Sequence, residues 1–255
     1  MRVPRLRMFA GPNGSGKSTI KDKIFKINPN WLGVYINPDD IEREIAETGH
    51  LDFGHFKVRT NDIGIRNFLT KADQLVGNGL DREVARLQFR KNLLLFNNVP
   101  LNSYFVSAIA DFLHEKLVVS KKTFSFESVM SHPQKIELLK RALKTGFRNY
   151  LYFVATEDPE INVSRVKTRV EQGGHGVPEV KIRSRYYRSL DNLLAALRQT
   201  DRAYIFDNSG VEATLIAEVT DGKNVEIRNS NVPVWFKKYV LDKGTKNNSR
   251  TAVGL

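Results

Sequence analysis

Residues 11–18 read Gly-Pro-Asn-Gly-Ser-Gly-Lys-Ser and match the phosphate-binding pattern G-x-x-x-x-G-K-[ST]. The three glycines permit backbone conformations that a β-carbon would forbid, so successive N–H groups can point at an anion. Lys17 would place its charge on the outer phosphates, and Ser18 would offer a hydroxyl to Mg²⁺. The pattern therefore predicts that ATP and Mg²⁺ are bound by these residues: Gly11, Pro12, Asn13, Gly14, Ser15, Gly16, Lys17, Ser18 and Thr19.

Two adjacent acids, Asp39 and Asp40, follow the predicted strand Gly33–Ile36. A carboxylate at the end of such a strand can accept a proton from a hydroxyl group while orienting that group toward the γ-phosphate. Either acid could instead cap the following helix. With two acids, one can cap and the other can act, and we predict that Asp39 is the base or the orienting group.

Glu127 stands at the end of another predicted strand, Thr123–Phe126. An acid at this place could assist Mg²⁺, could hydrogen-bond an acceptor substrate, or could be a solvated carboxylate. The chain has no run of four aliphatic residues followed by Asp, so the usual Walker B pattern is missing. We predict a catalytic role for Glu127.

A basic run flanks the glycine-rich segment Gly173–Pro178. Arginines on two helices joined by a mobile turn are typical of a lid that closes over a transferring phosphoryl group. The alternative is a solvated basic helix face, which is how most charge runs behave. We predict Arg169 as a catalytic residue, and as further nucleotide contacts His175, Arg183 and Arg185. The turn Asp207–Ser209 could contact adenine or be a plain turn.

Strands and helices alternate along the chain, which predicts an α/β fold of the P-loop type with a mainly parallel sheet between helical layers. The five predicted core strands are short, apolar and bounded by turn or charged residues: Leu6–Ala10, Gly33–Ile36, Thr123–Phe126, Tyr150–Ala155 and Ala203–Phe206. The predicted helices begin or end at capping residues: they start at Pro38, Asp81, Asn102 and Pro178 and stop at Gly49 and Gly146.

We predict one domain over residues 1–242 with a helical insertion at about 52–120. Within the insertion, Asp81 would cap a helix over Arg82–Phe96, and residues 97–100 would form a turn between helices. An Asp-Gly turn between two β-rich runs predicts a hairpin at about residues 213–229. The polar tail 243–255 is predicted to be disordered.

Composition narrows the class of protein. The chain has 255 residues, carries a net charge of +12 and contains no cysteine. Disulfides, thiolate metal sites and cysteine nucleophiles are thereby excluded. No apolar run approaches the roughly 20 residues needed to cross a bilayer, and no signal peptide is recognisable, so we expect a cytoplasmic protein without membrane contact. Nothing indicates a coiled coil, and we expect a monomer.

The basic charge permits two interpretations. Arginines could face a nucleotide and a phosphorylated substrate, or the protein could bind nucleic acid. We favour the first, because the sequence has no helix-turn-helix, zinc or RNA-binding strand motif.

Taken together, the motifs resemble the zeta-toxin family of P-loop kinases, in its branch described as ABC-type ATPases or kinases. The matching segments are Gly11–Thr19, Tyr35–Ile41, Phe126–Ser128, Asn149–Val154 and Arg165–Tyr186. The resemblance implies phosphotransfer from ATP to a small acceptor, UDP-N-acetylglucosamine in the family, and it raises an antitoxin as a partner. It implies Lys17 as the Walker lysine, Asp39 as the base, Glu127 as the acid beside the acceptor and Arg169 as the first lid arginine. The second lid arginine of the family falls near Gly174-His175, so Arg183 or Arg185 would replace it.

Two other functions fit the sequence. A polynucleotide or tRNA kinase would explain the basic charge, and a regulatory ATP-binding module would explain the missing Walker B pattern.

Overall fold

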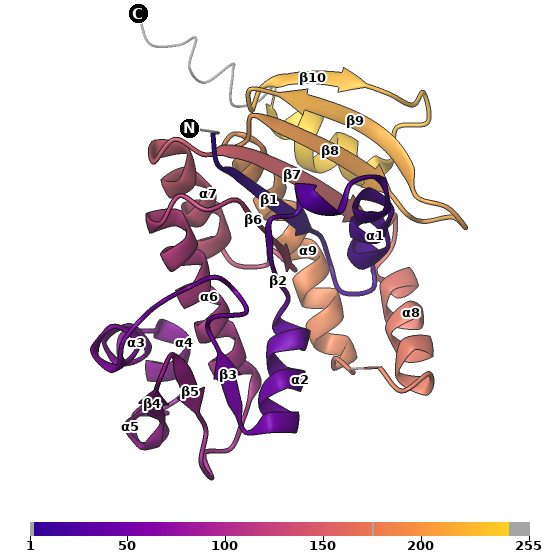
Figure 1. The fold of residues 1–255 in the computed structure, drawn as a ribbon. Helices are drawn as coiled ribbons and strands as arrows, with labels where there is room; N and C mark the ends of the chain where they lie inside the picture. Colours follow the sequence, from indigo (N-terminus) through magenta and orange to yellow (C-terminus); the bar gives the residue numbers. More distant parts are fainter. Residues whose placement is uncertain (1–2, 175, 245–255) are drawn as a thin grey trace, which may run out of the picture. The chain divides into compact units, whose positions relative to one another are not determined.

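The computed structural model describes residues 3–174 and 176–244. It has two compact units (Figure 1). The first comprises Met1–Trp31 and Glu127–Leu255, and the second comprises Leu32–Phe126. Within the described part of the chain, no helix has both the length and the apolar character that crossing a membrane requires.

The first unit is built on neighbouring strands in the order β10-β9-β8-β7-β1. Strand β7 pairs in parallel with both β1 and β8, whereas β9 is antiparallel to β8 and to β10. The strands are β1 Arg5–Ala10, β7 Arg148–Ala155, β8 Arg202–Asp207, β9 Thr214–Thr220 and β10 Asn224–Ile227. Their buried apolar residues form the core, as expected for a mainly parallel sheet.

Helices lie on both sides of these strands. In Figure 1, α1 (Lys17–Ile27) is on the near side, while α9 (Glu179–Leu197) and the yellow segment that includes α10 (Val234–Phe236) are on the far side. The ring of Phe153 on β7 lies 6.1 Å from that of Trp235 on α10, so Phe153 faces the far side. The remaining elements of this unit are η1 Pro29–Trp31, α7 Gln134–Lys144, α8 Pro159–Glu171 and the π-helical turn η2 Lys237–Leu241.

The second unit contains β2 (Val34–Ile36), paired in parallel with the first residues of β6 (Phe124–Ser128). Its central helix is α6 (Ser103–Val119), which Asn102 caps by accepting hydrogen bonds from Tyr104 N and Phe105 N. The other helices are α2 Pro38–Thr48, α3 Asp62–Leu69, α4 Asp73–Val76 and α5 Asp81–Arg86. A small antiparallel sheet has the order β3-β5-β4, with strands His50–Asp52, Leu93–Leu95 and Gln88–Arg90.

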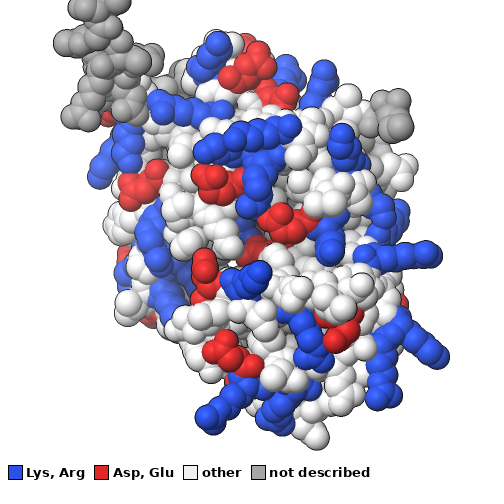
Figure 2. All heavy atoms as spheres, turned by 90° about the vertical axis from the view of Figure 1, so that its left-hand side faces the viewer, with Lys and Arg blue, Asp and Glu red and all other residues white. Residues whose placement is uncertain are grey.

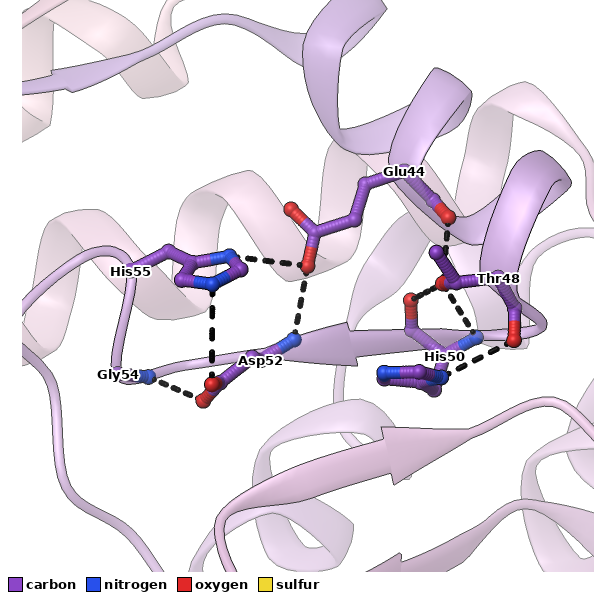
Figure 3. A network of polar contacts seen from close by, with 6 residues as sticks. All are labelled: Glu44, Thr48, His50, Asp52, Gly54 and His55. Atoms are coloured by element: carbon purple, nitrogen blue, oxygen red, sulfur yellow. Dashed lines mark hydrogen bonds and ion pairs between the residues drawn. The ribbon is translucent and has the colours of Figure 1, made fainter.

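A polar network fixes the end of α2 to β3 and the loop behind it (Figure 3). Glu44 on α2 accepts hydrogen bonds at Oε1 from Asp52 N (3.0 Å) and pairs there with His55 Nδ1 (3.2 Å). Asp52 Oδ1 in turn accepts from Gly54 N at 2.7 Å. These bonds tie three consecutive segments of the second unit together. They hold α2, which carries Asp39 in its first turn, in a defined orientation within that unit.

The predicted fold class is confirmed. All five predicted core strands are present, and β9 and β10 form the predicted hairpin. Helix α2 starts at Pro38 and ends at Gly49, whose φ of 75° is the left-handed cap conformation that glycine favours. The tail prediction falls mostly on residues 245–255, which lie outside the described residues.

The predicted helix Arg82–Phe96 is wrong. Helix α5 starts at Asp81 rather than after it, ends at Arg86, and is followed by the strands β4 and β5. Lys91 and Asn92 both have positive φ (49° and 69°) and join these strands as a two-residue turn. The apolar residues of this segment fit helical and strand spacing alike. The strand β3, distant in sequence, pairs with β5 and decides between them. Residues 97–100 therefore connect a strand to α6, not two helices, and the insertion is only partly helical.

Candidate functional site

The phosphate-binding loop lies in the first unit, between β1 and α1. Gly11, Gly14 and Gly16 have φ values of 140°, 74° and 94°, which side-chain-bearing residues rarely adopt. Helix α1 has no side-chain cap and no acidic residue in its first turn. Its N-terminal N–H groups and partial positive charge are therefore available to an anion.

The glycines are also required by what lies behind the loop. A β-carbon on Gly11 would overlap the carbonyl oxygen of Val154, and one on Gly16 would overlap the amide nitrogen of Asn208. A β-carbon on Gly14 would lie 2.6 Å from the carbonyl oxygen of Asn162. Glycine at these positions thus permits both the turn itself and close packing against β7, α8 and the end of β8.

Two asparagines hold the loop from this inner side. Asn162 Nδ2 donates to Asn13 O at 2.6 Å, and Asn208 Nδ2 donates to Ser15 O at 2.8 Å. In a planar trans peptide the C=O and the next N–H point in opposite directions. Fixing these two carbonyls therefore directs the N–H groups of Gly14 and Gly16 away from the asparagines, toward the side where a phosphate would bind.

Asn162 belongs to a fully buried chain of hydrogen bonds. Thr156 Oγ1 donates to Asn162 Oδ1, and Tyr186 OH on α9 donates to Thr156 O at 2.6 Å. Asn162 and Thr156 have no exposed surface. Burial raises the pKa of Tyr186, so its hydroxyl remains a donor across the physiological range. This series of hydrogen bonds links α9 through α8 to the phosphate-binding loop.

Asn208 is positioned by a separate set of bonds. Its backbone N–H donates to Ala155 O at 2.8 Å. The Arg165 guanidinium donates to Asn208 O at 2.7 Å and to Gly210 O at 3.1 Å. Arg165, part of the predicted lid run, therefore anchors the loop after β8. The prediction that this turn touches adenine is untested, but its Asn208 side chain contacts the phosphate-binding loop.

Lys17 and Ser18 begin α1 at the mouth of the loop. Lys17 Nζ donates to Pro12 O at 2.8 Å, which keeps the ammonium group over the loop. Ser18 Oγ donates to Glu127 Oε2 at 2.9 Å, although 109 residues separate them in sequence. The structure thus brings Glu127, at the end of β6, to the hydroxyl that the motif assigns to the metal.

The oxygen atoms of Ser18 and Glu127 suit Mg²⁺. Mg²⁺ prefers hard oxygen ligands and is usually held by one or two protein groups together with phosphate oxygens and water. No group of three or more His, Cys, Asp or Glu residues among the described residues could hold a metal by itself. A site completed by nucleotide phosphates is consistent with both observations.

If Glu127 and Ser18 hold Mg²⁺, Glu127→Gln should raise the Mg²⁺ concentration needed for ATP turnover by roughly tenfold or more, because the metal would lose a charged ligand. The measurement is ATP hydrolysis or transfer over a Mg²⁺ titration. Glu137→Gln is the matched control, because Glu137 is exposed on α7 and, among the residues that the structure describes, pairs with Lys140 alone. An unchanged Mg²⁺ dependence in the Glu127 variant would remove Glu127 from the metal site.

Asp39 lies in the second unit, at the start of α2. The cap is made by Asn37, whose Oδ1 accepts from Asp39 N at 3.1 Å. Asp40 forms an ion pair with Arg43 at 2.6 Å. The exposed carboxylate of Asp39 has no hydrogen-bond or ion-pair partner among the residues that the structure describes. Neither capping nor pairing therefore occupies Asp39, which leaves it available for chemistry.

The predicted lid residues differ in their environments. Arg183 binds Glu160 through Nε and Nη2 (2.6 and 2.9 Å) and Glu179 through Nη1 (3.0 Å), which lowers the pKa of Glu160. Arg185 is half-buried, has no anionic partner among the described residues, and has its pKa lowered by burial and then by Arg188. Arg169 is exposed in the last turn of α8, and His175 lies outside the described residues.

Sequence reasoning missed Asn162 altogether and gave Asn208 a different role. Both residues act through side-chain bonds to backbone carbonyls 149 and 193 residues away. No spacing rule encodes such contacts. The one available signal was that Asn162 and Asn208 each follow closely after the carboxyl end of a predicted parallel strand, the edge at which ligands bind.

The fold and the loop define a P-loop protein of the α/β class. No protein-family model matches the chain. An uncharacterised protein of Haemophilus influenzae is 36% identical over 63 residues, which are 25% of this chain and 45% of that protein. The chain thus matches less than half the length of this curated relative.

Two solved structures are similar over most of the chain. The AvrRxo1-ORF1:-ORF2 structure with ATP has a TM-score of 0.54 and 15% identity, over 92% of this chain and 63% of that one. The structure of the PezAT toxin-antitoxin system of Streptococcus pneumoniae has a TM-score of 0.50 and 14% identity. The match covers 98% of this chain and 87% of that one. At these identities the likeness concerns the fold, and the fold is the P-loop kinase-like one that the resemblance to the zeta-toxin family predicts.

Proposed function

We propose that the protein is a Mg-ATP-dependent phosphotransferase that phosphorylates a hydroxyl group of a small acceptor. The observation that carries this proposal is the contact between Ser18 and Glu127 beside a fully formed phosphate-binding loop. This arrangement provides for both the phosphates and the metal that phosphoryl transfer needs. The AvrRxo1 structure was obtained with ATP, which supports the nucleotide.

In the proposed reaction, Asp39 accepts the proton of the acceptor hydroxyl as its oxygen forms a bond to the γ-phosphorus. The bond from that phosphorus to the β,γ-bridging oxygen breaks, and ADP leaves. Lys17 and the loop N–H groups stabilise charge on the phosphate oxygens. Mg²⁺, when bound at Ser18 and Glu127, neutralises further charge. Arg169 and Arg185 are the proposed lid cations, and His175 is a further proposed nucleotide contact. Arg183 would first have to leave Glu160 and Glu179.

UDP-N-acetylglucosamine is the proposed acceptor, because the zeta-toxin-like motifs imply a nucleotide sugar. The test is mass spectrometry of the purified protein incubated with Mg-ATP and a panel of nucleotide sugars, with Lys17→Ala as control. The expected result is the addition of one phosphoryl group to UDP-N-acetylglucosamine, absent in the variant. Turnover of ATP with every sugar unmodified would reject this acceptor class and favour nucleic acid or protein acceptors. No turnover at all would favour the regulatory module.

The proposal extends to toxicity and an antitoxin partner, supported by the likeness to the PezAT toxin-antitoxin structure. Induced expression of the chain alone in a bacterium should stop growth, because consumption of a nucleotide sugar starves the pathways that use it. Lys17→Ala should restore growth at equal protein level. Normal growth with the active protein, confirmed active by the mass-spectrometric assay, would refute toxicity while leaving the kinase activity in place.

A further inference from the structure

One face of the first unit's sheet is open to solvent on β8 and at the start of β7, whereas Arg7, Phe9 and Tyr152 on the same face are buried. In Figure 1, α1 is on the near side of β1 and β7, whereas β8, β9 and β10 continue beyond it. Exposure alternates along β8: Ala203 and Ile205 are buried, while Arg202 is exposed and Tyr204 half-buried. Alternation of this kind marks a sheet with one face on the core and one in water.

The register of the strands shows which side chains share this near face. Phe153 faces α10 on the far side, so its neighbours in β7 at even positions face the near side. Paired residues of adjacent strands point to the same side. Three near-face rows cross the strands in the order β1, β7, β8, β9. The first row contains Arg5 and Arg148, and the second contains Arg7, Tyr150, Arg202 and Thr220. The third contains Phe9, Tyr152, Tyr204 and Glu218.

The aromatic rings on this face form a continuous stack. Phe9 and Tyr152 lie 4.9 Å apart between ring centroids, and Tyr152 and Tyr204 lie 5.1 Å apart, at interplanar angles of 14° and 13°. The stack ends at Tyr204, whose row continues with Glu218 rather than another ring. A nucleobase could therefore extend the stack on β8.

Arginines lie among the rings. The guanidinium of Arg7 lies 5.3 Å from the centroid of the Tyr150 ring, and that of Arg202 donates to Tyr204 OH at 3.4 Å. Arg148 and Arg202 are exposed. The near-face residues of β1, β7 and β8 in these rows include no acid. The acids of this face, Glu218 and Glu226, are on β9 and β10, where both pair with Arg228.

This segregation distinguishes the sheet face from the side of the molecule drawn in Figure 2. On the side of the molecule drawn in Figure 2, Lys and Arg are interspersed with Asp and Glu. The net charge of +12 therefore does not by itself identify a nucleic-acid-binding surface on that side. On the sheet face, the arginines of β7 and β8 lie beside aromatic rings, and the acid of the Tyr204 row, Glu218, is on β9, where it pairs with Arg228.

We propose that the near face of β8, together with the exposed start of β7, binds single-stranded nucleic acid, with a base stacked on Tyr204 and the phosphates held by Arg202 and Arg148. The half-buried ring of Tyr204 can accept a base of any sequence, and the two exposed arginines can follow the backbone. A duplex fits less well, because its bases are already stacked on one another. The inference does not depend on the proposed phosphotransfer and concerns a surface built from other residues.

The test is fluorescence anisotropy of the full chain with fluorescein-labelled U15 RNA, T15 DNA and an RNA duplex of the same length, at about 150 mM salt. We expect binding of the single strands, with the duplex at least severalfold weaker. Tighter binding of U15 than of T15 would identify RNA as the preferred ligand. Equal binding of the two would show that the surface accepts single strands of either kind. Excess Mg-ATP should not compete.

Tyr204→Ser should weaken binding of U15 roughly tenfold. Arg202→Gln should reduce the slope of the logarithm of the binding constant against the logarithm of the salt concentration by about one. Arg228→Gln, on the same face but already paired with two acids, is the charge-matched control and should change little. Arg202→Gln changes an exposed side chain, so it tests the proposal even if the Tyr204 variant is unstable. Absence of U15 binding, competition by ATP, equal binding of duplex, or equal effects of Arg202→Gln and Arg228→Gln would overturn the proposal.

Discussion

Replacing Asp39 with Asn should reduce phosphotransfer by roughly 10²–10⁴-fold, the range typical of a lost general base, while ATP binding is unchanged. The physical reason is that Asn keeps the size and the hydrogen-bond geometry of Asp but cannot take up the acceptor's proton. The carboxylate of Asp39 is exposed and unoccupied among the described residues, while Asn37 makes the helix cap. The variant should therefore fold normally.

Two measurements check this prediction. The rate of transfer gives the catalytic effect, and calorimetric titration with ATP gives the binding constant. Asp40→Asn is the matched control, since Asp40 adjoins Asp39 and, within the described part of the chain, pairs with the exposed Arg43 alone. Full activity in Asp39→Asn, or an equal loss in Asp40→Asn, would show that Asp39 is not the base.

The second large effect is expected from Asn162→Leu. Leucine has a similar volume but leaves the carbonyl of Asn13 without the Asn162 donor, and leaves the hydroxyl of Thr156 only its bond to Asp158 O at 3.2 Å. An unsatisfied buried group costs about 1–3 kcal/mol, so the free energy of unfolding should fall by about 1–4 kcal/mol. ATP affinity should fall as well, because the N–H group of Gly14 loses its fixed direction.

Asn149→Leu separates loop positioning from general destabilisation. Asn149 is buried and donates to Leu139 O at 2.7 Å and to Gln199 O at 2.9 Å, at the start of β7 and so at the opposite end of that strand from the phosphate-binding loop. It should lower stability in denaturant unfolding without changing ATP affinity. In a Thr156→Val background the cost of Asn162→Leu should be smaller, since the hydroxyl that donates to Asn162 is then already absent. An Asn162 variant that binds ATP normally would show that the loop holds its conformation unaided.

The sequence by itself determined the features that depend on neighbouring residues. Residues 11–18 require glycines and a lysine at fixed spacing, so the nucleotide loop is readable from a short string. Buried parallel strands appear as apolar runs, and the ends of α2 and α6 are marked by Pro38, Gly49 and Asn102. These signals arise from backbone geometry within a few residues, which is why the strands and most helices were predicted correctly.

The tertiary structure alone decided which side chains meet. Pairing with β3 turned a helix-compatible segment into β4 and β5. The fold set Asn162 and Asn208 behind the loop, brought Glu127 to Ser18, and fixed Arg183 on two carboxylates. Such contacts join positions far apart along the chain. Their partners are selected by the packing of whole elements, and a local pattern carries no information about that packing.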